Sequence, residues 1–236
     1  MYKKRLGAYK ITYILHRDFN IDISVGRTYR LLKTLNLPTL STKKPTYSHY
    51  SDNINYQNHL NQHFNQNSPN LVWVSDITYI KVCNKWVYLC VIIDLFSRKP
   101  IAWATSNKPD SNLTVKTLHI ALKNRNYPKG LMFHSDRGSQ YTSFSFRNEL
   151  DKYNITQSFS KKVYPYDNAV CECFFKYLKL EETNRNTYKT IIELNLALYK
   201  YINLFYCDKR PHTTLNMLTP NEYEHNYYNY INKQYQ

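Results

Sequence analysis

Three acidic residues have the types and the spacing to do chemistry together. Asp76 stands inside the apolar run LVWVSDITYI (71–80), which is predicted to be a buried strand. Asp136 follows the apolar run 131–133, and Glu172 lies in the predicted helix NAVCECFFKYLKLEE. A carboxylate in a buried position needs a partner, a hydrogen-bond network or a metal ion. Each residue alone has an ordinary explanation: a paired structural Asp, a turn residue and a solvated helical Glu.

The three carboxylates together predict a site for divalent cations. Two Asp residues on strands and one Glu on a helix, in a chain of formal net charge +15, describe an acidic cluster that tolerates burial only with such ions. Magnesium suits the cluster because it takes hard oxygen ligands from protein, phosphate and water. Two ions about 4 Å apart would clamp the attacking and leaving oxygens of an in-line phosphoryl displacement. This is the chemistry of nucleases, polymerases and transposases.

The elements that must position these residues predict an α/β layered domain. Three strand-like runs follow one another and predict a meander, over 71–80, 85–97 and 100–105. Helices and strands then alternate, in the order helix 113–123, strand 131–134, helix 144–153, strand 155–158, a helix after 167 and a helix over 190–205. Open α/β sheets bind ligands at the carboxyl ends of their strands, where Asp136 is predicted. Gly138 would let the chain turn away close to this carboxylate.

The helix that carries Glu172 also carries cationic residues. Asp167 is expected to cap its first turn. Lys176 and Lys179 lie four and seven residues after Glu172, so helical spacing predicts all three on one side. We expect the two lysines to hold a DNA backbone near Glu172, with Asn168 one turn earlier as a polar neighbour. A solvated face of ordinary Glu and Lys residues would have the same pattern.

Residues 1–40 predict a pair of short helices. Ser24 is expected to cap the second helix. The apolar residues that recur near the helical period in this second helix are Val25, Tyr29, Leu32 and Leu35. The basic residues on the opposite face are Arg27, Arg30 and Lys33. A basic second helix fits a DNA-binding helix-turn-helix, and an ordinary helical hairpin with a solvated basic side fits equally well.

Composition divides the chain into four parts. Residues 1–40 form the helix-turn-helix-like DNA-binding segment, and 41–68 form a polar linker in which a helical turn is predicted over 59–64. Residues 69–226 form the catalytic core with its carboxyl-terminal helices, and 227–236 form a tail.

The composition favours a nucleic-acid partner. Lys plus Arg number 32 against 17 Asp plus Glu, and such a surplus draws the chain to a polyanion. The longest apolar run, VYLCVII (87–93), is far short of the roughly 20 residues that a spanning helix needs, and no secretory segment follows the basic start, so a cytoplasmic protein is expected. Five cysteines without a CxxC pair argue against a disulfide framework and a zinc ribbon. The helical spacing of His59 and His63 is not enough to predict a zinc site.

Five motifs carry a family resemblance. They are SDITYI (75–80), IDLFSRK (93–99), HSDRGSQYTS (134–143), YPYDNAVCECFFKYLK (164–179) and KRPHTTLNMLTPNEYE (209–224). Their combination resembles the insertion-sequence transposases of the IS three family, which are relatives of retroviral integrase with an RNase H-like core. Thirty-five residues separate Asp136 from Glu172, the spacing between the second and third catalytic acids in that family. The resemblance covers nearly the whole chain.

The resemblance implies a fold, an activity and partners. It implies an RNase H-like mixed sheet flanked by helices, and DNA cleavage and strand transfer by Asp76, Asp136 and Glu172 with Mg²⁺ or Mn²⁺. A water would first free a DNA 3′-OH, which would then attack a second phosphodiester. The family also implies action as a homo-oligomer on DNA, in the bacterial nucleoid, with an upstream-frame helix-turn-helix protein or fusion partner.

Two departures from the family and two alternatives accompany this interpretation. Val163 stands where relatives usually have a glycine, and the chain begins later than the family's usual first helix. A truncated or decayed copy that binds DNA without catalysis is the first alternative. A stand-alone RNase H-like nuclease acting on RNA–DNA hybrids is the second, and it leaves the amino-terminal helices and the KRPH motif unexplained.

Three residues near these motifs are interpreted as structural. His212 is expected to pack against Tyr residues rather than act as a base. Cys171 and Cys173 flank Glu172, but the metals expected there prefer oxygen ligands, so we assign the two thiols to packing or to chance.

Overall fold

The computed structural model describes residues 6–35, 56–161 and 165–234. The chain forms two compact units, one made of Met1–Ser48 with Tyr177–Asn186 and the other of His49–Lys176 with Thr187–Gln236. The second unit contains Asp76, Asp136 and Glu172.

The first unit contains the two predicted amino-terminal helices, α1 (Ala8–Phe19) and α2 (Val25–Thr34). Thr28 is buried between them, and the Thr12 hydroxyl donates to its Oγ1 at 2.8 Å. The predicted apolar face of α2 stays largely uncovered by the described residues, since Tyr29 is 58% and Leu35 67% exposed. A π-helix (Lys179–Thr183) belongs to the same unit.

Ser24 caps α2 as predicted, because its hydroxyl accepts the Arg27 N–H at 3.2 Å. Ser24→Ala should lower the local stability of α2 by about 1 kcal/mol, since a helix N–H loses its acceptor. Amide hydrogen exchange over residues 25–31 measures this loss, with Ser24→Asp as the control that keeps an acceptor. Equal exchange in Ser24→Ala and the unmutated protein would contradict the assigned cap.

The second unit is built on a five-stranded mixed sheet of order β3-β2-β1-β4-β5. Its strands are β1 (Val72–Val82), β2 (Lys85–Asp94), β3 (Lys99–Ser106), β4 (Met132–Ser135) and β5 (Thr156–Phe159). The first three pair antiparallel, which confirms the predicted meander. β4 is parallel to β1 and to β5, so the meander continues into the α/β part of the sheet.

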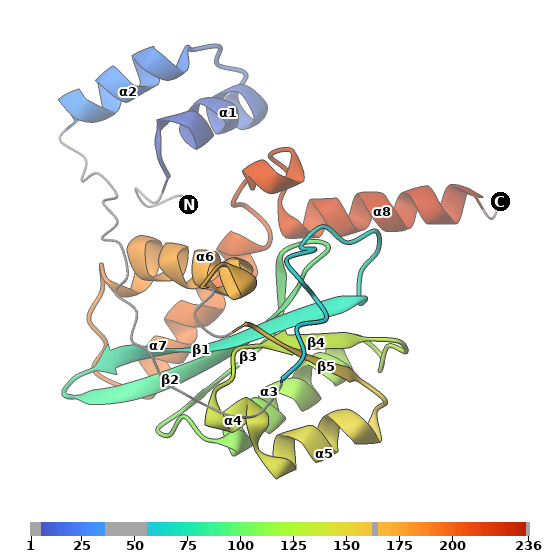
Figure 1. Ribbon diagram of the computed structural model, residues 1–236. Helices are drawn as coiled ribbons and strands as arrows, with labels where there is room; N and C mark the ends of the chain where they lie inside the picture. The colour runs from blue at the N-terminus through green and yellow to red at the C-terminus, as the bar shows by residue number, and fades with distance from the viewer. Residues whose placement is uncertain (1–5, 36–55, 162–164, 235–236) are drawn as a thin grey trace. The chain divides into compact units, whose positions relative to one another are not determined.

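Helices cover both faces of this sheet. The helices of one face, seen together in Figure 1, are α3 (Ser111–Asn124), α4 (Ser139–Thr142) and α5 (Phe144–Lys152). Ala102 and Ala104 of β3 join the buried core beneath them. Side chains alternate along a strand, so Trp103 and Thr105 point to the opposite face. There they bond Asn203 of a π-helix (Lys200–Tyr206) and Asn195 of α7 (Ile191–Tyr199).

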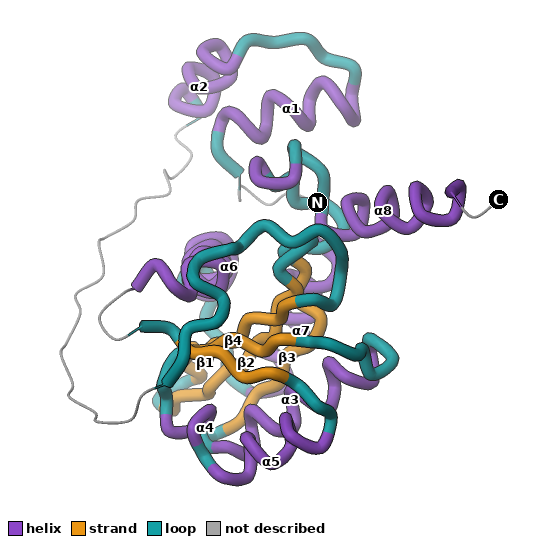
Figure 2. The backbone as a smooth tube through the Cα atoms, turned by 45° about the vertical axis from the view of Figure 1, so that its right-hand side comes forward, coloured by secondary structure: helices purple, strands orange, loops and turns teal. Residues whose placement is uncertain are grey.

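Two further helices complete the described fold. α6 (Ala169–Leu178) follows a 3-10 turn (Pro165–Asn168), and α8 (Pro220–Gln234) ends the described chain. Figure 2 shows α8 as a separate straight element near the carboxyl terminus. The described part of 227–236, which was expected to be a tail, continues α8 as far as Gln234. None of the helices in the described ranges is long and apolar enough to cross a membrane.

Residues 56–70 form an irregular segment with turns at 61–62 and 69–70, not the helical turn expected over 59–64. Asn61 and Gln62 have φ values of 42° and 62°, a left-handed conformation that interrupts a helix. His63 donates its backbone N–H to the carbonyl of Leu60. Residues 41–55 of the predicted linker and Val163 lie outside the described residues.

Candidate active site

The parallel pairing of β1 and β4 brings two of the three acids to matching positions just beyond the last paired residues, with Asp76 inside β1 and Asp136 directly after β4. Val74 pairs with His134, and each predicted acid, Asp76 and Asp136, lies two residues further along its strand direction. Both carboxylates are half-buried. The two Asp residues therefore lie at corresponding positions on neighbouring strands, as a shared ligand site requires.

Asp136 is held by the backbone that follows it. Its Oδ1 accepts the N–H of Gly138 at 3.0 Å. Desolvation raises the pKa of the Asp136 carboxyl, and the Gly138 hydrogen bond opposes this rise only in part. Within the described ranges we find no ion pair that would neutralise Asp136.

The structure gives a different reason for glycine at position 138 than the chain turn expected from the sequence. Its φ is −59°, so no left-handed turn is needed there. A Cβ atom at this position would lie 2.5 Å from Gln140 Nε2 and 3.0 Å from Asp136 Oδ1. Glycine is needed because the backbone approaches the carboxylate closely.

Gly138→Ala should therefore impair cleavage more than folding. The methyl group would displace the Asp136 carboxylate, and we expect the DNA cleavage rate to fall about tenfold or more, since a misplacement of about 1 Å can cost 10²-fold. The unfolding free energy should change by less than about 1 kcal/mol, because alanine adopts this φ readily.

Gly130→Ala is the matched control for this substitution. Gly130 has φ +71° with open space around it, so this variant should lose about 1 kcal/mol of stability and keep its cleavage rate. Urea unfolding and cleavage are measured on both variants. A Gly138→Ala protein that cleaves as fast as Gly130→Ala would contradict the close-approach explanation.

Glu172 lies on α6, whose start is bonded to the strand of Asp76. The Asn168 side-chain amide donates to the Ser75 carbonyl at 3.2 Å, one residue before Asp76. Glu172 is exposed, and partial desolvation raises the pKa of its carboxyl. Asn168 is only 6% exposed, so its predicted contact with DNA does not fit the structure.

The thiol of Cys171, the residue before Glu172, is fully buried. Burial raises the pKa of this thiol well above its usual value, and negative charge on Asp76, Asp136 and Glu172 raises it further. The thiol therefore stays protonated near pH 7, and its burial fits the packing role expected for Cys171.

A buried hydroxyl pair below the acids was not predicted. Ser75 Oγ lies 2.8 Å from the Tyr141 hydroxyl and donates to the Val91 carbonyl at 2.9 Å. Tyr141 is fully buried and belongs to α4, just after Asp136. The pair thus joins the chain next to Asp76 with the chain next to Asp136. The only signal for it in the sequence was the polar Ser75 within an apolar strand.

His134 is a second buried polar residue near Asp136. Its ring nitrogens lie 2.9 Å from Ser158 Oγ and 3.2 Å from Ser160 Oγ. Burial lowers the pKa of His134 to about 4, so the ring is neutral near pH 7. It therefore joins β4 to β5 without adding positive charge beside the acids.

Residues 66–220 of the chain match integrase cores. Two family models, each described as "Integrase core domain", match residues 66–165 and 153–220. The transposase for insertion sequence element IS904 from Lactococcus lactis subsp. lactis (strain IL1403) is 36% identical over 229 residues, covering 94% of this chain and 88% of that protein. Transposase InsF for insertion sequence IS3A from Escherichia coli (strain K12) is 35% identical over 168 residues, covering 71% of this chain and 58% of InsF.

The chain belongs to the IS3 family of insertion-sequence transposases. This membership confirms the resemblance found in the motifs and makes the chain an enzyme, a DNA transposase of the polynucleotidyl transferase class. A chain in the cryo-EM structure of the simian T-cell lymphotropic virus intasome in complex with PP2A regulatory subunit B56 gamma has a similar fold. Its TM-score is 0.51 at 18% identity, covering 89% of this chain and 73% of that one. The predicted RNase H-like fold is thereby confirmed.

The basic residues that were predicted to bind DNA lie on three different helices of this transposase. Lys176 is exposed on α6, one turn after Glu172. Lys179 begins the π-helix of the first unit, so the regular spacing predicted from Glu172 ends before it. Arg27, Arg30 and Lys33 are exposed on α2.

Asp167 and His212 also lie in the family motifs, and both make contacts that support the fold. Asp167 does not cap α6 as predicted, because its carboxylate accepts three N–H groups from other segments. His212 is 7% exposed, and its ring lies 4.6 Å from that of Tyr206, which confirms its predicted packing role.

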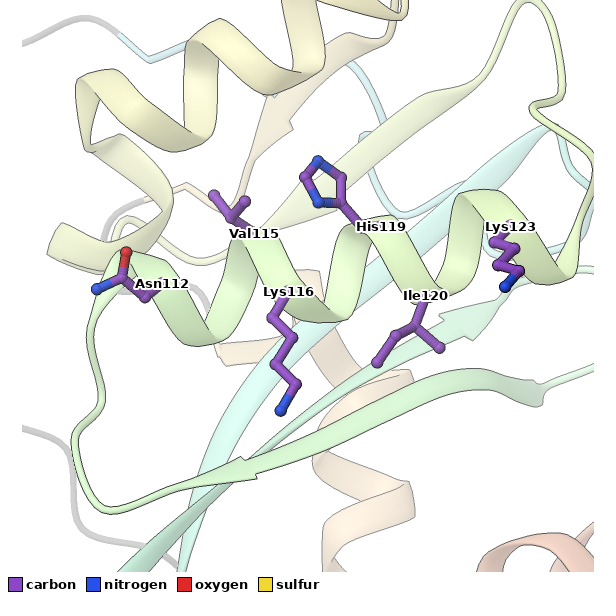
Figure 3. A pocket seen from close by; sticks show the side chains of 6 residues that line it. All are labelled: Asn112, Val115, Lys116, His119, Ile120 and Lys123. Carbon is purple, nitrogen blue, oxygen red and sulfur yellow. The ribbon is translucent and has the colours of Figure 1, made fainter.

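One pocket on the described part of the core contains none of the three acids. A pocket of about 440 Å³ is lined by α3 residues alone, as Figure 3 shows. Its lining residues are Asn112, Val115, Lys116, His119, Ile120 and Lys123. Two lysines and no carboxylate cannot hold Mg²⁺, so we do not assign the transposase active site to this pocket.

Asp76 and Asp136 follow paired residues of neighbouring strands, but the three predicted acids do not form a finished metal cage in the described residues. Over residues 6–35, 56–161 and 165–234, no group of three or more His, Cys, Asp and Glu side chains could hold a metal ion as arranged. The donor chemistry nevertheless fits a hard cation, because the acids offer carboxylate oxygens, and the pKa of Asp136 and of Glu172 is raised by desolvation. A divalent ion would supply the positive charge that favours their ionised forms.

Proposed function

We propose that this transposase cleaves DNA at the ends of an insertion sequence and transfers the freed strand, with Asp76, Asp136 and Glu172 as its catalytic residues. The observation that carries the proposal is the placement of Asp76 and Asp136 at corresponding positions of two parallel strands. The bond from Asn168 to Ser75 supports it, because it fixes the start of the Glu172 helix to the strand of Asp76.

The proposed reaction consists of two displacements at phosphorus. In the first, the oxygen of water bonds to the phosphorus, and the bond to the DNA 3′ oxygen breaks, which leaves a 3′-OH and a 5′-phosphate. In the second, that 3′-OH attacks a target phosphodiester, and the target's own 3′ oxygen departs. The number of phosphodiester bonds is conserved in the second step, so no oxidant, reductant or nucleotide cofactor is needed.

Asp76, Asp136 and Glu172 are proposed to hold one or two divalent ions, Mg²⁺ or Mn²⁺. When bound, such ions activate the attacking oxygen and stabilise the departing one. Asp76 and Asp136 would provide the first ligands, since each follows the last paired residues of β1 and β4 by two positions, and Glu172 would join from α6. The role of the chain is to hold these oxygens beside the scissile phosphate and to keep Asp136 in place through Gly138.

Basic residues, all exposed except the half-buried Lys179, are proposed to bind the DNA backbone. Lys176 lies one helical turn from Glu172, so it is placed to contact a phosphate near the cleaved bond. Lys179 is proposed as a second phosphate contact from the first unit. The proposed contacts on α2 are Arg27, Arg30 and Lys33. Action as a homo-oligomer on DNA in the bacterial nucleoid, with an upstream-frame helix-turn-helix protein or fusion partner, belongs to the same proposal.

Cleavage of labelled element ends tests the proposal. The purified chain is incubated with DNA duplexes that carry the ends of its own insertion sequence, with Mg²⁺, Mn²⁺ or EDTA. We expect nicking at the 3′ end of the element with either metal and none with EDTA. Binding of the ends without nicking, in the presence of the upstream-frame protein, would instead favour the copy that binds DNA without catalysis.

A further inference from the structure

We propose that Asp167 is a positioning residue that fixes the helix of Glu172 to the segment 56–62. The inference deepens the proposed function and rests on it, because it concerns the placement of a proposed catalytic acid. Asp167 is 1% exposed and lies five residues before Glu172.

Three N–H groups converge on the Asp167 carboxylate. Asn58 Nδ2 donates to Oδ2 at 2.7 Å, and Gln62 Nε2 donates to Oδ1 at 2.8 Å. The backbone N–H of Lys161 donates to Oδ2 at 2.7 Å. A buried carboxylate with three short hydrogen bonds is well satisfied, whereas its removal would leave buried donors without an acceptor. The carboxylate thus joins a turn before β1 and the end of β5 to the start of α6.

The segment 56–62 is itself fastened to the core, so it can serve as an anchor. Gln57 accepts the backbone N–H of Phe159 at 2.9 Å, and the backbone N–H of Leu60 donates to Ser158 Oγ at 3.1 Å. Leu60 is 2% exposed. The rings of Tyr56 and Phe159 lie 4.6 Å apart. These contacts hold the turn against β5 independently of Asp167.

The same segment also supports the chain next to Asp136. Arg137 Nη2 donates to the Tyr56 carbonyl at 3.4 Å, and its guanidinium lies 5.6 Å from the centre of the Tyr56 ring. Arg137 Nε donates to the Ser160 carbonyl at 2.9 Å. One turn therefore braces the residue after Asp136 and, through Asp167, the residues that lead to Glu172. Removal of Asp167 would take away one of the two described bonds that hold the start of the Glu172 helix, the other being that of Asn168, while Asp136 stays braced.

Asp167→Ala tests the inference because it should lower the rate of DNA cleavage and leave the affinity for element ends nearly unchanged. We expect the cleavage rate at saturating DNA and Mg²⁺ to fall at least tenfold, while the affinity for element ends, measured by fluorescence anisotropy, changes less than twofold. Amide exchange over residues 169–175 should become at least fivefold faster, because the start of α6 loses one of its anchors. If Asp167 only stabilised the fold, the variant would have a smaller folded fraction, and its cleavage and its DNA binding would fall together.

Two further variants separate positioning from stability. Ser97→Ala removes a buried 2.7 Å bond to Glu224 of α8 and should change neither the cleavage rate nor the exchange rate of α6 by more than twofold. Asp167→Asn should impair cleavage because its amide would face the donors of Asn58 and Lys161. Adding Asn58→Asp places an acceptor opposite that amide. The double variant should cleave at least three times faster than Asp167→Asn alone.

The outcomes distinguish this inference from the proposed function. Rate and α6 exchange within twofold of the unmutated protein in Asp167→Ala would overturn the positioning role even if the unmutated chain cleaves DNA. If the unmutated chain does not cleave, the proposed function fails, and the exchange data alone decide the structural link: faster α6 exchange supports it and unchanged exchange overturns it.

Discussion

Asp136→Asn is expected to reduce the cleavage of element ends about 10³-fold while leaving the protein folded. Loss of one anionic ligand weakens the stabilisation of the transition state by several kcal/mol, and each 1.36 kcal/mol is a factor of ten in rate. Asparagine has nearly the same shape, and its side-chain oxygen can still accept the Gly138 N–H, which now reaches Asp136 Oδ1 at 3.0 Å. Single-turnover cleavage with Mg²⁺ measures the effect.

The same substitution should not destabilise the protein. Desolvation raises the pKa of Asp136, which means that the folded state disfavours its charged form. Removal of that charge should leave the unfolding free energy unchanged or increase it, as urea titration without metal can show. Affinity for element ends should stay within threefold. A variant that cleaves at the unmutated rate, or that loses activity only because it unfolds, would contradict the assigned role.

Glu224→Ala is expected to lower the unfolding free energy by about 3 kcal/mol, the largest loss of stability that we predict. Glu224 is 5% exposed and its Oε1 accepts from Arg125 Nη2 at 2.6 Å and from Ser97 Oγ at 2.7 Å. Lys99 Nζ donates to Oε2 at 3.1 Å. Removal of one partner of a buried ion pair costs about 3–5 kcal/mol, and the partial exposure of Lys99 places this case at the lower end. Urea unfolding at pH 7 is the measurement.

The Glu224 network also predicts a pH dependence with a definite sign. Burial alone would raise the pKa of Glu224, but hydrogen bonds and charge from Arg125, with Lys99 and Ser97, outweigh it and hold the pKa below the ordinary value of 4.5. The folded state therefore binds this proton more weakly than the unfolded state. The stabilisation is fully present above pH 4.5 and is lost as the pH falls through the depressed folded value.

Glu224→Gln is the control for this dependence, since it keeps the shape without the charge. The difference in unfolding free energy between the unmutated protein and Glu224→Gln should shrink as the pH falls below 4.5. Contributions from other groups, such as the buried Asp94, cancel in this difference. A difference that stays constant from pH 7 to pH 3 would show that Glu224 is not stabilised by its cationic partners.

Much of the fold was predictable from local pattern. The strand-like runs before residue 106 are rich in β-branched and aromatic residues, and they became β1, β2 and β3 in the predicted order. Polar caps marked helix starts, as Ser24 does for α2 and Thr190 for α7. Such signals lie within a few residues of the feature that they predict, so the sequence reveals them directly.

The parts that were missed depend on partners far away in the chain. Asp167 has the sequence context of a helix cap, but its carboxylate bonds Asn58 and Gln62, more than a hundred residues earlier. Similarly, Ser75 meets Tyr141 only after the sheet has formed. No pattern in the local sequence predicts such contacts between residues that are distant in the chain. Gly138 was singled out correctly, yet its reason is a close approach to Asp136 rather than a special φ.

The sequence predicted which residues make up the candidate site but not how they are arranged in space. Carboxylates at unusual positions drew attention to Asp76, Asp136 and Glu172, and the sheet register supplies a reason for two of them to meet. The cationic neighbours were less predictable, because helical spacing alone cannot show that Asn168 turns inward or that a π-helix begins at Lys179.

A crystal structure of the protein with an element end and Mn²⁺ tests the central claim most directly, because manganese is located by its anomalous scattering. The account predicts one or two manganese peaks bound by carboxylate oxygens of Asp76 and Asp136, with Glu172 within ligand distance of the same ions or joined to them through water. Manganese bound to the DNA complex only at other residues, with these three carboxylates free of metal, would contradict it.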